Sequence, residues 1–130
     1  MILDSSAVIA IILREPGHEG MLDAVCDSRE VGIAAPTLVE ATIVLSSSIG
    51  KDGRGLLARF LAEAGVLTIP FSEPHWSSAV DAWLRFGKGR HKAALNFGDC
   101  LAHAVARVAG RPLLCVGDDF ARTDLEVRRA

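Results

Sequence analysis

Short runs of consecutive apolar residues alternate along this chain with longer segments in which apolar residues recur at helical spacing. Continuous apolar runs of this length are typical of strands that are buried on both faces of a parallel sheet. Such runs occupy residues 1–4, 30–35, 66–71 and 113–116, and residues 125–127 are a candidate fifth strand at a sheet edge.

The segments between these runs carry the signals of helices. Leu57 and Leu61 lie one helical turn apart, Pro36 suits the first turn of a helix, and Gly65 and Gly110 are typical helix ends. The expected helices cover residues 5–15, 17–28, 36–50, 54–65, 73–87 and 99–110. Strands that alternate with helices predict an α/β fold. We therefore expect one domain over residues 1–130, with a central parallel sheet of four or five short strands and helices on both faces.

Composition narrows the function classes. Half of the 130 residues are apolar, but no segment approaches the ~18 to 20 uninterrupted apolar residues of a membrane span, so no membrane association is expected. The apolar start lacks the positive charge of a signal peptide, and three scattered cysteines favour buried thiols over disulfides. Both features predict a cytoplasmic protein. The apolar excess on a small chain also predicts a covered surface, in a homodimer or against a partner protein.

Acidic residues follow the strands or open the helices after them. Asp4 ends the first apolar run, and Asp118 and Asp119 follow the fourth; Glu40 lies one turn into an apolar helix, and Asp99 lies at the start of the last helix. Each of these acids has an ordinary interpretation as a helix cap, a turn residue or part of a polar helix face. Ligands of parallel α/β sheets bind beyond the carboxyl ends of the strands, so this group of acids can also share one cleft.

A shared cleft would place several carboxylates close together, and buried carboxylates without partners are costly. The segments MILDSSAV, TLVEATI and NFGDCLA contain no Lys or Arg that could pair with these acids. A divalent cation would neutralise them, and ligation by carboxylate oxygens suits Mg²⁺ or Mn²⁺.

The chain resembles the PIN-domain ribonucleases, and among them the VapC toxins of bacterial VapBC toxin–antitoxin systems. The resemblance covers essentially the full length. It is carried by MILDSSAVIAIILREPG, APTLVEATIVL, LNFGDCLAHAVA and PLLCVGDDFARTDL, in this order.

The resemblance implies an Mg²⁺- or Mn²⁺-dependent endoribonuclease that is neutralised by a cognate VapB antitoxin. The acidic set of the family falls on Asp4, Glu40, Asp99 and Asp118 as catalytic residues and metal ligands, with Asp119 as an alternative to Asp118. Ser5, Ser6 and Asn96 match the polar residues that orient these carboxylates. The resemblance also implies a homodimer and a VapB surface on the helical pair from Thr37 to Gly65.

A basic stretch precedes Asp99. No acid falls between Asp81 and Asp99, whereas five cationic or titratable residues do. They are a solvated loop or, because phosphate contacts supply most non-specific affinity for nucleic acids, an RNA-binding set. The set consists of Arg85, Lys88, Arg90, His91 and Lys92. Phe86 and Phe97 are expected in the core. His103 is expected in the core or partly exposed, because no second His accompanies it at metal-ligand spacing.

Two rival interpretations remain. A phosphotransfer domain also places carboxylates and Mg²⁺ at strand ends, but the first strand is followed by Asp4-Ser5-Ser6 rather than Asp-x-Asp, and the third strand by no candidate phospho-accepting Asp. A catalytically silent PIN-like protein-binding module would bind a partner without binding metal or cutting RNA.

Overall fold

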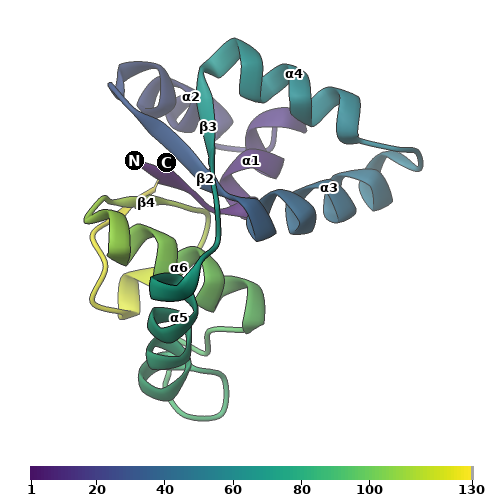
Figure 1. Ribbon diagram of the computed structural model, residues 1–130. Coiled ribbons are helices and arrows are strands. Elements are labelled where there is room, and N and C mark those ends of the chain that lie inside the picture. Colours follow the sequence, from purple (N-terminus) through teal and green to yellow (C-terminus); the bar gives the residue numbers. More distant parts are fainter. Residues whose placement is uncertain (130) are drawn as a thin grey trace.

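The computed structural model of the chain describes residues 1–129 and consists of one α/β domain around a five-stranded sheet (Figure 1). All strand pairs are parallel. The strands are β1 (Ile2–Leu3), β2 (Val31–Ala34), β3 (Val66–Ile69), β4 (Leu113–Leu114) and β5 (Val127–Arg128), in the order β3-β2-β1-β4-β5. The predicted fold class is confirmed, and the fifth strand forms at the expected edge.

Helices cover both faces of this sheet, because each crossover between parallel strands returns over one face. Figure 1 shows the helices divided between the two sides of the sheet. The first face carries α1 (Ser5–Ile12), α2 (His18–Asp27), α3 (Ala35–Ile49) and α4 (Arg54–Ala64). The second face carries α5 (Glu73–Phe86), α6 (Phe97–Ala109) and the short 3-10 helix η1 (Phe120–Arg122).

Each face has its own apolar core. Leu3, Val8 and Leu45 are fully buried in the core under α1 to α4. Leu113 and the small residues of α6 fill the other core, where alanines let α6 approach the sheet closely. None of the helices within residues 1–129 combines the length and apolar character needed to cross a bilayer.

The strand order reverses between β1 and β4. The chain proceeds outward from β1 to β2 and β3, then returns to the other side of β1 for β4 and β5. The backbone N–H of Asp4 donates to the carbonyl of Leu114 over 3.0 Å, so the carboxyl ends of β1 and β4 lie side by side. This is the switch point at which parallel sheets bind ligands.

Several expected boundaries differ from the structure, most of them by one or two residues. The first helix ends at Ile12, before Glu15, because Arg14 has a left-handed backbone with φ 55°. Only Leu113 and Leu114 of the fourth apolar run form a strand. The last helix begins at Phe97, not at Asp99, because Asn96 caps it.

A polar cluster fastens the segment between η1 and β5 to the second face. The carboxylate of Asp124 accepts from Nε2 of His103 over 3.0 Å and from the guanidinium groups of Arg85 and Arg107. His103 is 1% exposed, so the expectation of a core histidine is confirmed. Burial lowers the pKa of His103, although the bond to Asp124 partly offsets the effect. The imidazole is therefore held neutral by its surroundings.

We expect Asp124→Ala to lower the free energy of unfolding by about 1–3 kcal/mol, because the buried N–H of His103 would lose its acceptor. Urea unfolding at pH 7.5 measures the change. Glu126→Ala, at an exposed position two residues away, is the control and should stay within about 0.5 kcal/mol of the parent protein. Equal effects of the two substitutions would contradict a specific role for the cluster.

Candidate functional site

Asp4 leaves β1 at the switch point and caps α1. Its Oδ2 atom accepts from the backbone N–H of Ser6 over 3.0 Å and from the Ser6 hydroxyl. That hydroxyl in turn accepts from the backbone N–H of Val116 over 3.1 Å, so Ser6 joins the ends of β1 and β4. The other carboxylate oxygen, Oδ1, is buried without a hydrogen-bond partner within residues 1–129. Burial, and then the charge of Glu40, raises the pKa of Asp4.

Glu40 reaches the same place from α3. Its Oε1 atom accepts a hydrogen bond from the hydroxyl of Ser5, the first residue of α1. Its Oε2 atom lies so close to Gly98 on α6 that a Cβ atom at position 98 would stand 1.8 Å from it. The missing side chain at Gly98 therefore makes room for the Glu40 carboxylate beside the first turn of α6.

Asp99 occupies the third position of α6. A reciprocal capping pair fixes it, in which the Asp99 N–H donates to Oδ1 of Asn96 over 2.8 Å and the Asn96 N–H donates to Oδ2 of Asp99 over 2.9 Å. Burial raises the pKa of Asp99 to about 6, and the charges of Asp4, Glu40 and Asp119 add to the effect. The carboxylates predicted from three separate segments thus act on one another electrostatically.

The two acids after β4 have different surroundings. The carboxylate of Asp118 forms an ion pair with Arg129, and both side chains are exposed. Asp119 is one of the charges that raise the pKa of Asp99. The structure therefore brings Asp4, Glu40 and Asp99 together with Asp119 in electrostatic range, and it directs Asp118 toward Arg129.

The donor set fits a divalent cation chemically, although no three Asp, Glu, His or Cys side chains within residues 1–129 already form a ligand cage. Glu40 and Asp99 each hold a neighbouring donor of the fold instead, Ser5 and Asn96. The fit rests on the unpartnered Oδ1 of Asp4 and on the burial and neighbouring negative charges that raise the Asp99 pKa. A hard cation with oxygen preference would relieve both.

The predicted basic residues differ in the contacts that they make. Arg85 is engaged with Asp124, and the guanidinium of Arg90 lies 4.6 Å from the ring centre of Trp83. Lys88 and Lys92 are exposed, and neither forms a salt bridge within the described part of the chain. These two lysines are the cations with the fewest competing partners.

His91 serves the loop itself. Its Nδ1 atom accepts from the backbone N–H of Ala93 over 3.0 Å, and its ring meets the edge of Phe86. Phe86 is buried as expected, but the expectation of a core position for Phe97 is wrong, because 81% of this residue is exposed.

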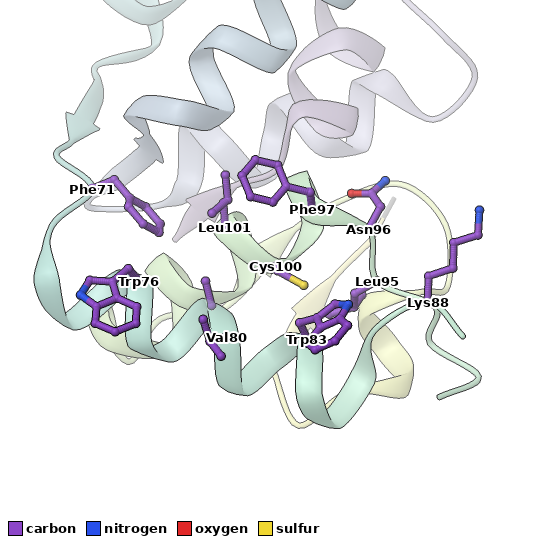
Figure 2. A pocket seen from close by; sticks show the side chains of 11 residues that line it. Phe71, Trp76, Val80, Trp83, Lys88, Leu95, Asn96, Phe97, Cys100 and Leu101 are labelled. Atoms are coloured by element: carbon purple, nitrogen blue, oxygen red, sulfur yellow. The ribbon is translucent and has the colours of Figure 1, made fainter. Parts of the chain in front are cut away.

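Phe97 lines an apolar groove of about 750 Å³ beside the acidic site, which the sequence reading missed. Figure 2 shows the groove between α5 and the first turns of α6. Its lining comprises Phe71, Trp76, Ala79, Val80, Trp83, Lys88, Leu95, Asn96, Phe97, Cys100 and Leu101. The spacing of Trp76, Val80 and Trp83 on one helix face could have indicated this groove. Periodicity alone, however, does not tell whether such a face packs on the core or stays exposed.

Comparisons with known proteins find relatives that match nearly the whole chain. The PIN domain family model matches residues 1–126. Ribonuclease VapC36 of Mycobacterium tuberculosis is 42% identical over 129 residues, covering 98% of this chain and 93% of the relative. Ribonuclease VapC of Mycolicibacterium smegmatis is 38% identical over 125 residues, covering 96% of this chain and 97% of the relative.

Solved structures with low sequence identity share the fold. The crystal structure of VapBC2 from Rickettsia felis, bound to a DNA fragment from their promoter, matches with a TM-score of 0.79 at 18% identity and covers 98% of this chain and 96% of that chain. Mycobacterium tuberculosis VapC20, described as a toxin that cleaves the sarcin-ricin loop, matches with a TM-score of 0.77 at 17% identity and covers 95% of both chains.

We expect Gly98→Ala to displace the Glu40 carboxylate and to weaken Mn²⁺ binding by about 10- to 100-fold, as losses of metal-site support commonly do. Isothermal titration calorimetry measures this change. Gly55→Ala is the matched control, because a Cβ atom at Gly55 in α4 meets nothing within 4 Å. Equal Mn²⁺ affinity of the two variants would contradict the role of the close approach at Gly98.

The raised pKa of Asp99 predicts a pH-dependent effect of Asp99→Asn. In metal-free protein the ionised carboxylate is disfavoured, and this penalty develops as pH rises from 3.8 to about 6. Asp99→Asn should therefore raise the free energy of unfolding at pH 7.5 by on the order of 1–2 kcal/mol, allowing for partial exposure. Near pH 3.5, below both pKa values, the carboxyl is mostly protonated in both states and the gain should nearly vanish. Urea unfolding in EDTA at the two pH values tests it, and an equal gain at both would exclude the electrostatic cause.

Proposed function

The chain belongs to the PIN-domain family, among the VapC ribonucleases, and from this premise we propose that it is the toxin of a type II toxin–antitoxin system that cleaves RNA phosphodiester bonds. The observation that carries the proposal is the meeting of Asp4, Glu40 and Asp99 at the sheet's switch point, without a basic partner for Asp4 or Asp99 among their hydrogen bonds. Transfer RNA is the first substrate class to test.

We propose that Mg²⁺ or Mn²⁺ is held by Asp4 and Asp99, with Glu40 and either Asp119 or Asp118 completing the set. Such an ion supplies a water of lowered pKa and stabilises negative charge that builds on the phosphate. The chain's own donors keep the ligands in place. Ser6 fixes one oxygen of Asp4 and leaves the other open, while Ser5 and Asn96 do the same for Glu40 and Asp99.

The basic loop supplies the contacts to the RNA backbone in this proposal. Lys88 and Lys92 bind phosphates directly. Arg90, which stacks on the Trp83 ring, and His91, which accepts from the backbone N–H of Ala93, add weaker contacts to the RNA backbone. Arg85 forms a salt bridge with Asp124 and therefore contributes least to RNA binding. Backbone contacts of this kind position the substrate without reading its sequence.

A VapB antitoxin and a second copy of the chain are the proposed protein partners, since structural neighbours include toxin–antitoxin complexes. The expected surface from Thr37 to Gly65 needs one revision, because Leu57 is 4% exposed and belongs to the core. The exposed apolar side chains there include Val39, Ile43 and Val44 on α3, which line a second hollow next to Glu40. An antitoxin Arg beside that face would satisfy the carboxylates in place of the metal.

We propose a cytoplasmic location. Cys26, Cys100 and Cys115 are all free thiols. Burial raises the pKa of Cys100 to about 11 and that of Cys115 to about 12, so both stay protonated and unreactive at neutral pH. Unpaired thiols suit a reducing compartment.

We expect Asp99→Asn to reduce cleavage of a transfer RNA by about 10²-fold or more in Mn²⁺, and EDTA to abolish cleavage by the wild type. A gel assay with labelled RNA measures both rates. Asp23→Asn, an exposed acid on α2, is the charge-matched control and should cut at the wild-type rate. Equal cutting by wild type and Asp99→Asn would remove the catalytic assignment, and no cutting by either would favour the catalytically silent module.

A further inference from the structure

Both tryptophans of the chain line the groove described above. Trp76 is 59% exposed and Trp83 is 45% exposed, and across the groove stands Phe97 at 81%. Figure 2 shows the rings of Phe71 and Phe97 on one side and the two indoles on α5 on the other. Large aromatic side chains are seldom left this accessible, so the groove has the character of a binding surface.

Trp83 is held in place before any ligand arrives. The guanidinium of Arg90 lies 4.6 Å from its ring centre, on one face. Gly87 makes room for the indole, because a Cβ atom there would lie 2.6 Å from Cδ1 of Trp83. A fixed aromatic ring loses little freedom when a flat partner stacks against it.

The charges around the groove favour an anionic, aromatic ligand. Lys88 lines it, Arg90 contacts Trp83, and no acid occurs between Asp81 and Asp99. The hollow on α3 also borders Phe97, but it differs in charge, because Glu40 lines it and no Lys or Arg does. Bases stack on aromatic rings while cations hold the backbone, and single-stranded nucleic acids are bound by this combination.

The groove adjoins the acidic site at Asn96. Asn96 caps Asp99 through its Oδ1 atom and also lines the groove. Its Nδ2 group has no hydrogen-bond partner within residues 1–129 and is available to the edge of a base. Phe97 follows directly, two residues before Asp99. A nucleotide next to a phosphate at the carboxylates would therefore have its base within reach of Phe97.

We propose that the groove binds an unpaired base of the RNA substrate next to the cleaved phosphate, stacked on Phe97 and Trp83 with Lys88 on the adjoining phosphate. This inference rests on the proposed ribonuclease function and adds a requirement to it. The base must be unstacked from its own strand, so cleavage sites fall in loops or single strands and not within a continuous duplex.

Tryptophan fluorescence tests this proposal directly, since both indoles report from the groove. Asp99→Asn protein is titrated with a short single-stranded RNA, with the same RNA lacking one base, and with the matching duplex. We expect quenching and tight binding with the intact single strand, and binding at least fivefold weaker with each of the other two. Equal binding of the intact and base-lacking strands overturns the proposal without any groove variant.

Substitutions at Phe97 test whether RNA binding needs an aromatic ring or only an apolar side chain. Phe97→Tyr keeps a ring and should bind RNA within about twofold of the parent, whereas Phe97→Leu should bind about 5- to 100-fold more weakly, the range expected for one stacked base. Leu67→Ala, at an exposed apolar position on β3, is the control and should bind as the parent does.

Two further outcomes are distinguishable. If light scattering shows that Phe97→Leu changes the oligomeric state while RNA affinity stays the same, a second copy covers the groove and the proposal is wrong. If wild-type protein cleaves RNA in Mn²⁺ and Phe97→Leu cleaves it with an equal KM, the base site is wrong but the ribonuclease function stands. Absence of cleavage by the wild type would instead refute the ribonuclease function.

Discussion

Repulsion between carboxylates that the fold holds close together is the constraint on which the rest of this structure depends. Asp4 lies at the switch point of the sheet, almost fully buried, and Glu40 and Asp99 approach it from helices on opposite faces. Burial and neighbouring charge together move the pKa of Asp99 to about 6. A protein that maintains such an arrangement bears a cost in stability. The proposed divalent cation would remove that cost, because it would neutralise the carboxylates.

Hydrogen bonds from neighbouring residues hold the carboxylates in place against their mutual repulsion. Ser6 bonds both to Asp4 and to the strand end at Val116, Ser5 bonds to Glu40, and Asn96 fixes Asp99. Each carboxylate thus has one anchored oxygen. On the second face the Asp124 cluster secures the segment that carries Asp119 back toward the sheet. Small polar residues and Gly98 therefore fix the positions of the carboxylates that make up the site.

Much of this architecture could be predicted from the sequence, because short apolar runs separated by helical segments have few arrangements other than a parallel sheet. The positions of Asp4, Glu40 and Asp99 followed from strand ends and helix starts. The difference between Asp118 and Asp119 could not be predicted, since adjacent residues of an irregular turn point in directions that a distant Arg129 helps to decide. Phe97 and the exposed face of α5 also escaped prediction, because the same periodicity describes a face packed on the core and a face that awaits a ligand.

The bond between Ser6 and Val116 joins residues 110 positions apart, and this spacing affects how the protein is made. At about 5–20 residues per second, the ribosome needs on the order of 10 s to pass from one to the other. Throughout that interval the central strand β1 has no β4 beside it, and Asp4 and Glu40 exist without Asp99 for most of it. The proposed active site therefore cannot assemble on a nascent chain until Asp99 has been translated, although Asp4 is made at the very start.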